Sequence, residues 1–513
     1  MLQRAAALAL AGLVVVAVAL PAEASEPAPG SPEYVARDVA NMAEAYGRQT
    51  APDGQLSPAY LSALAATTPA KTVEDLVRQA ASPTRPALTL ATVLPGANAG
   101  NPLRAGWDRT RGVRTPISFT SRDGALLVGD VYTPRPGARD PYTGARLTGP
   151  FPTVVIEPGS VQGSGRMYEW LAQDLAERGY VALLFDVQGE GRSETLPHQG
   201  PVADLPYCNP LAPPGMFEQT GCPGVPFQQV AGFVTGLRDA ITFALSTPSR
   251  PYPNRAAGES TVSPYNPRWR QVDHRPDRNS VTPGRTTRLA VVGHSMGAFA
   301  ASYVQGVDDR VMAAVALDKL SSTTLVAGPS GRLLGSADLP VRPVVPSLGI
   351  QSEYGFTVSP YTLSGGSALA PQPIPPTEAP DPRREQKTGF DGWRKAGVDT
   401  MVVVPRASTH LEYTDIALAL PASRYGQALS SVYTQAWLGT YLRHDAGARQ
   451  AVTATTWSYL EPTGNGGWDR IRLNRQDRLS RYYCSGIDVR AGGRVVNPDL
   501  AGVGCLTVHP LPG

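Results

Sequence analysis

A serine between two glycines is the residue of this chain best suited to act as a nucleophile. Ser295 lies in Gly293-His294-Ser295-Met296-Gly297, after a short apolar run and before a stretch rich in alanine. Gly-x-Ser-x-Gly between a strand and a helix is typical of a serine whose hydroxyl is lifted clear of the backbone. A glycine-rich turn without chemistry is the alternative interpretation. We predict that Ser295 is a catalytic nucleophile.

A serine hydroxyl needs a base, and position separates the six histidines of the chain. His294 lies inside the turn itself. His198 and His274 lie in long insertions. His444 falls at the end of the expected closing helix, and His509 lies in the tail after the last cysteine. His410 follows the strand-like run 400–404 after a short loop, which places it at the same sheet edge as Ser295. His410 is therefore the predicted base.

A carboxylate must orient the base by binding the far nitrogen of its ring. Glu353 follows the strand-like run that precedes the strand of His410, and Asp318 follows the run after Ser295. We predict Glu353 as this acid, with Asp318 as the alternative. Other carboxylates remain open, among them Asp381 and Asp391.

The oxyanion of an acyl-transfer reaction needs two preorganised backbone N–H donors. The amide of Met296 stands at the predicted helix start, directly after the serine. The second donor is expected in the glycine-rich loop 157–164, from Ser160 or else from Val161. A phosphate-binding loop is disfavoured there because the Lys-Ser/Thr ending of such loops is missing.

The elements that must position these groups follow an alternating pattern. Stretches with apolar residues at helical spacing lie between several apolar runs that predict strands. The six predicted strands are 152–156, 180–185, 289–292, 311–317, 344–350 and 400–404. Continuous apolar strands alternating with helices predict an α/β fold with a mostly parallel central sheet and helices on both faces. Ligands bind beyond the carboxyl ends of such strands.

The rest of the chain divides around this predicted domain at residues 114–446. Residues 1–24 have the pattern of a secretory signal peptide cleaved near Ala24, and 25–113 predict a helical segment and linker. Residues 195–226 are expected to form a cap insertion and 249–288 a long loop. Residues 447–513 are expected to form a C-terminal extension stapled by a disulfide.

The expected helices of the N-terminal segment rest on apolar residues at helical spacing. They are Tyr34, Val35, Val39, Met42, Ala43 and Tyr46.

Four cysteines in an exported chain predict disulfides, and neighbour pairing gives Cys208–Cys222 and Cys484–Cys505. The chain has no Cys-x-x-Cys or His-x-x-x-His spacing, so a metal site is not expected. The predicted serine chemistry implies no other cofactor. A net charge of +3 is too mild to indicate nucleic acid. No stretch of the expected mature chain is long and apolar enough for a stable membrane anchor. The oligomeric state is open.

The chain resembles the α/β-hydrolase superfamily over about residues 114–446. Four motifs carry the resemblance: Pro158-Gly159-Ser160, the stretch 185–193, Gly293 to Gly297, and Thr409-His410. Nucleophile, acid and base in the order Ser295, Glu353, His410 match that superfamily. The resemblance implies a secreted serine esterase or lipase-like enzyme that acts on a small-molecule or lipid-like ester through an acyl-enzyme.

Three departures keep other functions open. The loop begins Pro158-Gly159 where His-Gly is usual, and Gly355 stands where the superfamily commonly has an aspartate. The hairpin 123–134 resembles the first strands of X-Pro dipeptidyl-peptidase-like hydrolases, which usually have a tyrosine where this chain has Met296. A peptidase of that type and an acyltransferase are therefore the alternative activities. A non-enzymatic binding protein that kept the fold is a further alternative.

Overall fold

The computed structural model describes most of the chain outside its first 26 residues. The described ranges are 27–52, 54–81, 100–122, 124–160, 164–194, 230–255, 257–258, 261–321, 340–364, 374–381, 386–416, 424–464 and 466–503.

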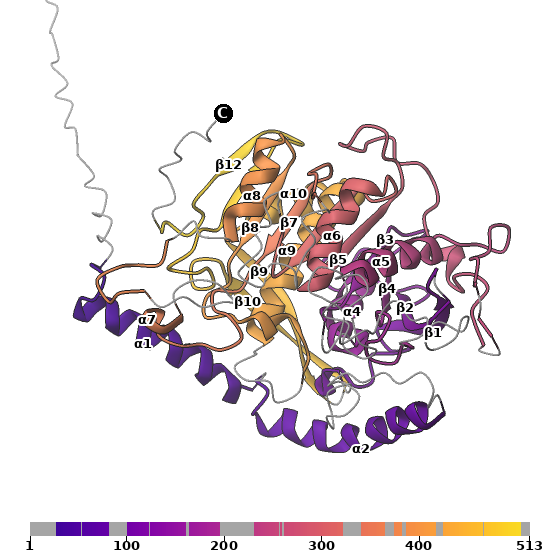
Figure 1. The fold of residues 1–513 in the computed structure, drawn as a ribbon, viewed down its shortest axis with the longest axis horizontal. Helices are drawn as coiled ribbons and strands as arrows, with labels where there is room; N and C mark the ends of the chain where they lie inside the picture. The colour runs from indigo at the N-terminus through magenta and orange to yellow at the C-terminus, as the bar shows by residue number, and fades with distance from the viewer. Residues whose placement is uncertain are drawn as a thin grey trace, which may run out of the picture.

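A ten-stranded sheet forms the centre of the molecule (Figure 1). Its strands are β1 (Gly112–Thr120), β2 (Leu126–Pro134), β3 (Thr153–Glu157), β4 (Val181–Phe185), β5 (Leu289–His294), β6 (Ala313–Leu317), β7 (Ser347–Ile350), β8 (Thr400–Val403), β11 (Gly486–Val489) and β12 (Val495–Asn497). The order across the sheet is β1-β2-β4-β3-β5-β6-β7-β8-β11-β12. A separate hairpin pairs β9 (Thr456–Gly464) with β10 (Gly467–Asn474).

The six central strands, β4-β3-β5-β6-β7-β8, are parallel, and both edges of the sheet are antiparallel. These central strands are the six apolar runs predicted from the sequence. The predicted α/β class and mostly parallel sheet are confirmed. Because the strands are parallel, their carboxyl ends meet at one edge, where the predicted site residues lie.

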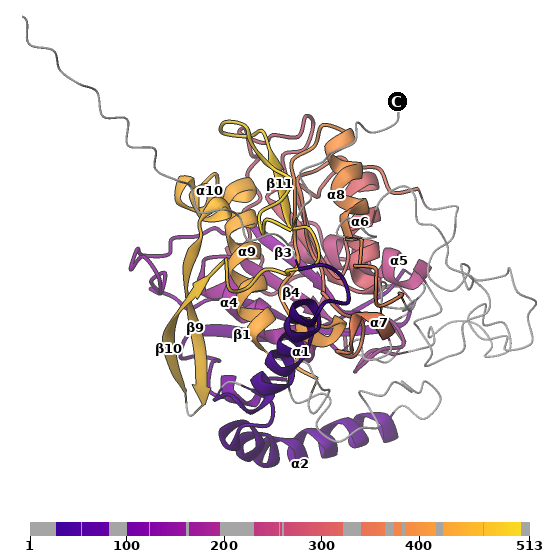
Figure 2. The ribbon, with the colours of Figure 1, turned by 90° about the vertical axis from the view of Figure 1, so that its left-hand side faces the viewer.

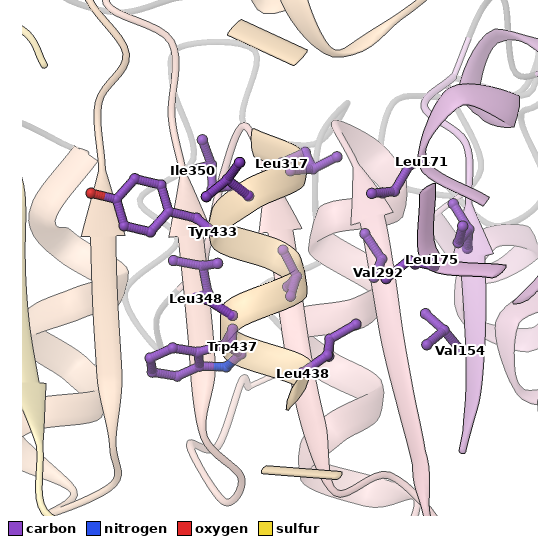
Figure 3. Packing of buried hydrophobic residues seen from close by; sticks show 14 of the residues in the cluster. Val154, Leu171, Leu175, Val292, Leu317, Leu348, Ile350, Tyr433, Trp437 and Leu438 are labelled. Carbon is purple, nitrogen blue, oxygen red and sulfur yellow. The ribbon is translucent and has the colours of Figure 1, made fainter. Parts of the chain in front are cut away.

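Helices cover both faces of the sheet. The described helices are α1 (Pro32–Gly47), α2 (Pro58–Ala81), α4 (Glu169–Glu177), α5 (Val230–Ala244), α6 (Met296–Val307), α7 (Tyr361–Ser364), α8 (Gln386–Lys395), α9 (Arg424–Leu442) and α10 (Ala446–Thr453). Helices α4 and α9 pack on one face, as Figure 3 shows for Leu171, Tyr433 and Trp437. Helices α5 and α6 pack on the other. Alternation along β3 supplies both cores, Val154 to the first and Val155 to the second.

The C-terminal stretch, predicted as an extension after residue 446, adds the strands β11 and β12 to the central sheet. Strand β11 pairs antiparallel with β8, the strand that leads to His410. The physical reason is that the far edge of β8 needs a hydrogen-bonding partner. Helix α10 likewise packs against α9.

The N-terminal helices lie against the outside of this body. Helix α2 runs along the lower edge in both Figure 1 and Figure 2. Helix α1 is present where the sequence predicted one, but only part of its predicted apolar face is buried: Tyr34 is buried, whereas Val35, Val39 and Tyr46 are about half exposed. The buried residues are Tyr34, Asp38, Asn41 and Ala45, of which two are polar. Apolar packing of Tyr34 and Ala45 and hydrogen bonds of the polar residues therefore orient α1 together.

Several predictions fall outside the described residues. They concern the signal peptide 1–24, the cap 195–226, Val161 and the cysteines Cys208, Cys222 and Cys505. Both predicted disulfides therefore stay predictions, although Cys484 is buried. Among the helices that the structure describes, none combines the length and apolarity needed to cross a membrane.

Candidate functional site

Ser295 occupies the sharp turn between β5 and α6. Its φ of 54° and ψ of −116° lie outside the regions that residues with a side chain usually adopt. The turn is tight because a Cβ on Gly293 would lie 1.9 Å from the Gly297 carbonyl oxygen. Strain at a single non-glycine residue persists only where its surroundings enforce it, and such residues cluster at functional sites. The structure thus places Ser295 as the sequence motif predicted.

His410 and Asp318 form a close pair beside this turn. Nδ1 of His410 lies 2.6 Å from Oδ2 of Asp318, and both side chains are buried. Asp318 directly follows β6, and His410 starts the short helix η8 (His410–Tyr413) that follows the loop after β8. The carboxylate can thus hold a proton on Nδ1 and leave Nε2 to act as a base.

The surroundings of Asp318 keep it ionised. Ser352 donates from its hydroxyl to Oδ2 at 2.6 Å and from its backbone N–H to Oδ1 at 3.2 Å. Burial by itself would raise the pKa of Asp318. The hydrogen bond from His410, the charge of that ring when protonated, and the Ser352 hydroxyl outweigh burial and lower the pKa to about 2.

Glu353, predicted as the acid, contacts other groups than His410. Its carboxylate accepts hydrogen bonds from the side chains of Asn41 and Ser480 and from the backbone N–H of Ala407. The prediction of Glu353 as the partner of His410 is therefore corrected in favour of its alternative, Asp318. The physical reason is that β6 and β7 are adjacent, so both carboxylates reach the same edge, but their side chains turn to different neighbours.

The other open carboxylates do not take this place either. Asp391 lies in α8 near Arg394, and Asp381 lies in a loop that the structure describes only in part.

His294 bridges the two sides of the site, a role that the sequence did not indicate. Its Nε2 lies 2.9 Å from the carbonyl oxygen of His410, and its Nδ1 lies 2.7 Å from the hydroxyl of Tyr168. Because a carbonyl only accepts, Nε2 carries the proton and Nδ1 accepts from Tyr168. Burial, followed by the neighbouring His410, lowers the pKa of His294 to about 3, so this ring is neutral at neutral pH.

The loop after β3 lies directly against the nucleophile turn. The backbone N–H of Gly159 donates to the Tyr168 hydroxyl at 3.0 Å. A Cβ on Gly159 would lie 3.0 Å from the Cβ of Ser295, so this close approach requires glycine. Ser160 follows in this loop. On the other side, α6 starts at Met296, where helical N–H groups have no carbonyl partner within the helix. Both predicted oxyanion donors thus belong to segments that flank Ser295.

One aromatic ring covers the outer side of the base. Phe356 packs edge-on against His410 with ring centroids 4.9 Å apart, and it is 46% exposed. His294 lies on the ring as well, at a centroid distance of 4.6 Å. The His410 ring is therefore fixed by its neighbours and by Asp318 together. Within the described residues, no group of three or more His, Cys, Asp or Glu side chains could hold a metal ion.

Comparison with known proteins gives little functional information. No model of a known protein family matches the chain. The chain is similar to the uncharacterised protein PA2218 of Pseudomonas aeruginosa, with 32% identity over 127 residues. That match covers 24% of this chain and 32% of PA2218, so the chain spans about a third of its relative's length.

Proposed function

We propose that this chain is a secreted serine hydrolase of the α/β-hydrolase superfamily that cleaves carboxylic esters through an acyl-enzyme. The observation that carries the proposal is the His410–Asp318 pair at 2.6 Å beside a serine at a positive φ. These residues end or follow the strands β5, β6 and β8 of one parallel sheet. The residue order Ser295, Asp318, His410 has the acid before the histidine, as in that superfamily.

Ser295 attacks the ester carbonyl while Nε2 of His410 takes the proton of its hydroxyl. Asp318 keeps the second proton on Nδ1 and stabilises the imidazolium that forms. The alkoxide leaves with the proton from Nε2, which gives an ester of Ser295. Water then attacks this acyl-enzyme with His410 again as base, and the acid product leaves.

Charge on the carbonyl oxygen develops between two segments of the site. The backbone N–H of Met296 belongs to the start of α6, where the helix dipole favours negative charge. The N–H of Ser160 is the proposed second donor, in the loop that Tyr168 anchors through Gly159. Preorganised donors of this kind commonly supply a large part of the rate enhancement.

Export and ester preference are inferred from the sequence. The basic residue, apolar stretch and Ala-x-Ala pattern of residues 1–24 support secretion. The resemblance to esterases and lipases supports an ester substrate, because the fold by itself does not determine the substrate.

The test is hydrolysis of p-nitrophenyl esters of short to long acyl chains by the purified mature protein. We expect turnover, with kcat reduced at least about a thousandfold in Ser295→Ala. The matched control is Ser302→Ala, a buried serine within α6 whose hydroxyl donates to the Ala298 carbonyl and accepts the N–H of Ser321. This control should retain activity. Equal activity of the wild type and Ser295→Ala would refute the proposal.

A further inference from the structure

Glu353 joins three segments that are distant in sequence. Its Oε2 accepts from the side-chain amide of Asn41 in α1 at 2.7 Å and from the N–H of Ala407 at 2.5 Å. Its Oε1 accepts from the hydroxyl of Ser480 at 2.5 Å. The carboxylate is fully buried. It therefore ties the N-terminal helix and the C-terminal stretch to the loop before His410.

The loops after β7 and β8 are joined along their length up to His410. The N–H of Glu353 donates to the Ser408 hydroxyl at 3.0 Å, and the N–H of Tyr354 donates to the Ser408 carbonyl at 2.9 Å. The N–H of His410 donates to the Gly355 carbonyl at 2.9 Å. The backbone of His410 is consequently placed by residues 353–355.

Ala407 shows why this loop needs support. Its φ is 53°, a left-handed conformation that is unfavourable for a residue with a Cβ. The N–H of Ala407 donates one of the hydrogen bonds that the Glu353 carboxylate accepts. Strained backbone persists when its surroundings determine it, so the Glu353 carboxylate favours the conformation that leads to His410.

Helix α1 contacts the same loop at a second point. Arg48, directly after the end of α1, donates to the carbonyl of Arg406 at 3.0 Å, and the Arg406 side chain pairs with Glu44 of α1. Asn41 contributes a further contact, a hydrogen bond from its amide to the Tyr354 hydroxyl at 3.0 Å. Helix α1 thus supports the loop from outside the sheet.

We propose that Asn41 and Glu353 are positioning residues, which hold the loop 405–410 so that His410 faces Asp318 and Ser295. The inference rests on the proposed function and deepens it. Through Asn41, the N-terminal helix α1 then contributes to the geometry of the active site. Misplacing a catalytic group by about 1 Å can reduce a rate by about a hundredfold. We therefore expect Asn41→Ala and Glu353→Gln to reduce kcat about tenfold to a hundredfold, with little change in KM.

The matched control lies one turn earlier on the same helix. Asp38 is buried like Asn41, and its carboxylate accepts the N–H of Tyr361, away from the His410 loop. Asp38→Ala removes a comparable buried contact between α1 and the body. All variants are compared with the wild type well below their melting temperatures.

Three measurements are made on the full mature chain. They are kcat and KM for a p-nitrophenyl ester, the rate of covalent labelling of Ser295 by a fluorophosphonate, and hydrogen exchange of the peptide 404–413. The proposal predicts that Asn41→Ala and Glu353→Gln slow labelling and speed exchange of this peptide, whereas Asp38→Ala does neither.

Two results overturn the account, and they are distinguishable. If the wild type is labelled but Asn41→Ala and Glu353→Gln match Asp38→Ala in labelling, kcat and exchange, the positioning role is wrong. If the wild type is neither labelled nor active, the proposed function has failed. Exchange of peptide 404–413 then still reports whether the two residues hold the loop.

Discussion

Two neighbouring strand ends carry buried carboxylates with opposite surroundings. Asp318 after β6 faces His410, which is charged during the proposed reaction, whereas Glu353 after β7 faces an amide, a hydroxyl and a backbone N–H. The pKa of Asp318 is lowered to about 2. Burial raises the pKa of Glu353, and the hydrogen bonds from Ser480, Asn41 and Ala407 only partly oppose this. Both carboxylates thus follow the end of a strand, and their hydrogen-bonding partners determine their different roles.

The hydrogen-bonding partners of the two carboxylates also come from different parts of the chain. Asp318 binds groups from the loops of the parallel sheet, Ser352 and His410. Glu353 binds groups from α1 and from the C-terminal stretch. The first is part of the proposed chemistry, and the second connects that chemistry to the segments outside the parallel strands.

Substitution of Asp318 and substitution of Glu353 should differ most in their effect on enzymatic activity. Asp318→Asn leaves the size of the side chain unchanged but cannot hold the required tautomer of His410, so kcat should fall about 10³- to 10⁴-fold. The fall in kcat of Glu353→Gln should be at least tenfold smaller than that of Asp318→Asn. Steady-state kinetics of both variants on one p-nitrophenyl ester checks the ratio. The assignment is wrong if Glu353→Gln is the more damaged enzyme.

The pH dependence of stability should differ in sign. Asp318 has a lowered folded-state pKa, so its contribution of about 2 kcal/mol is present at neutral pH and is lost as pH falls from about 5 to about 2. Glu353 has a raised folded-state pKa, so the folded state binds its proton more tightly. Its contribution to stability therefore decreases as pH rises above the ordinary pKa of a glutamate.

Urea unfolding of the wild type, Asp318→Asn and Glu353→Gln over a range of pH measures this difference. The stability gap between the wild type and Asp318→Asn should shrink as pH falls. The wild type should lose stability relative to Glu353→Gln as pH rises. Gaps that change in the same direction would contradict the opposite environments.

The smallest effect is expected on the outer face of α1, turned away from Glu353. Val39 is 52% exposed, so Val39→Ser should change the free energy of unfolding by less than about 0.5 kcal/mol. Asn41→Ala, two residues away, should destabilise by about 1–3 kcal/mol because a buried polar group loses its partner. Chemical denaturation measures both. If Val39→Ser lowers the free energy of unfolding more than Asn41→Ala does, Val39 belongs to a buried apolar face, as the sequence predicted.

The sequence predicted the central sheet well because its strands are continuous apolar runs. The strained turn at Ser295 and the loop of His410 were likewise predictable, since local motifs and strand ends place them. The choice between Asp318 and Glu353 was not predictable, because it depends on where two adjacent side chains turn. The role of Glu353 depends on Asn41, which lies 312 residues away, and no local pattern shows that contact.

His294 illustrates the same limit. As a residue inside the nucleophile motif it gave no signal of a separate role, yet it connects Tyr168 with the carbonyl of His410. The motif fixes where His294 lies along the chain. Its partners come from the loops after β3 and β8, which only the tertiary structure brings together.

Reaction of the purified protein with a fluorophosphonate, followed by peptide mapping by mass spectrometry, tests most directly whether Ser295 is the nucleophile. We expect one adduct per chain on Ser295, no adduct in Ser295→Ala, and much slower labelling in Asp318→Asn. An unlabelled Ser295, or an adduct at another residue with Ser295 unmodified, would contradict this assignment of the nucleophile.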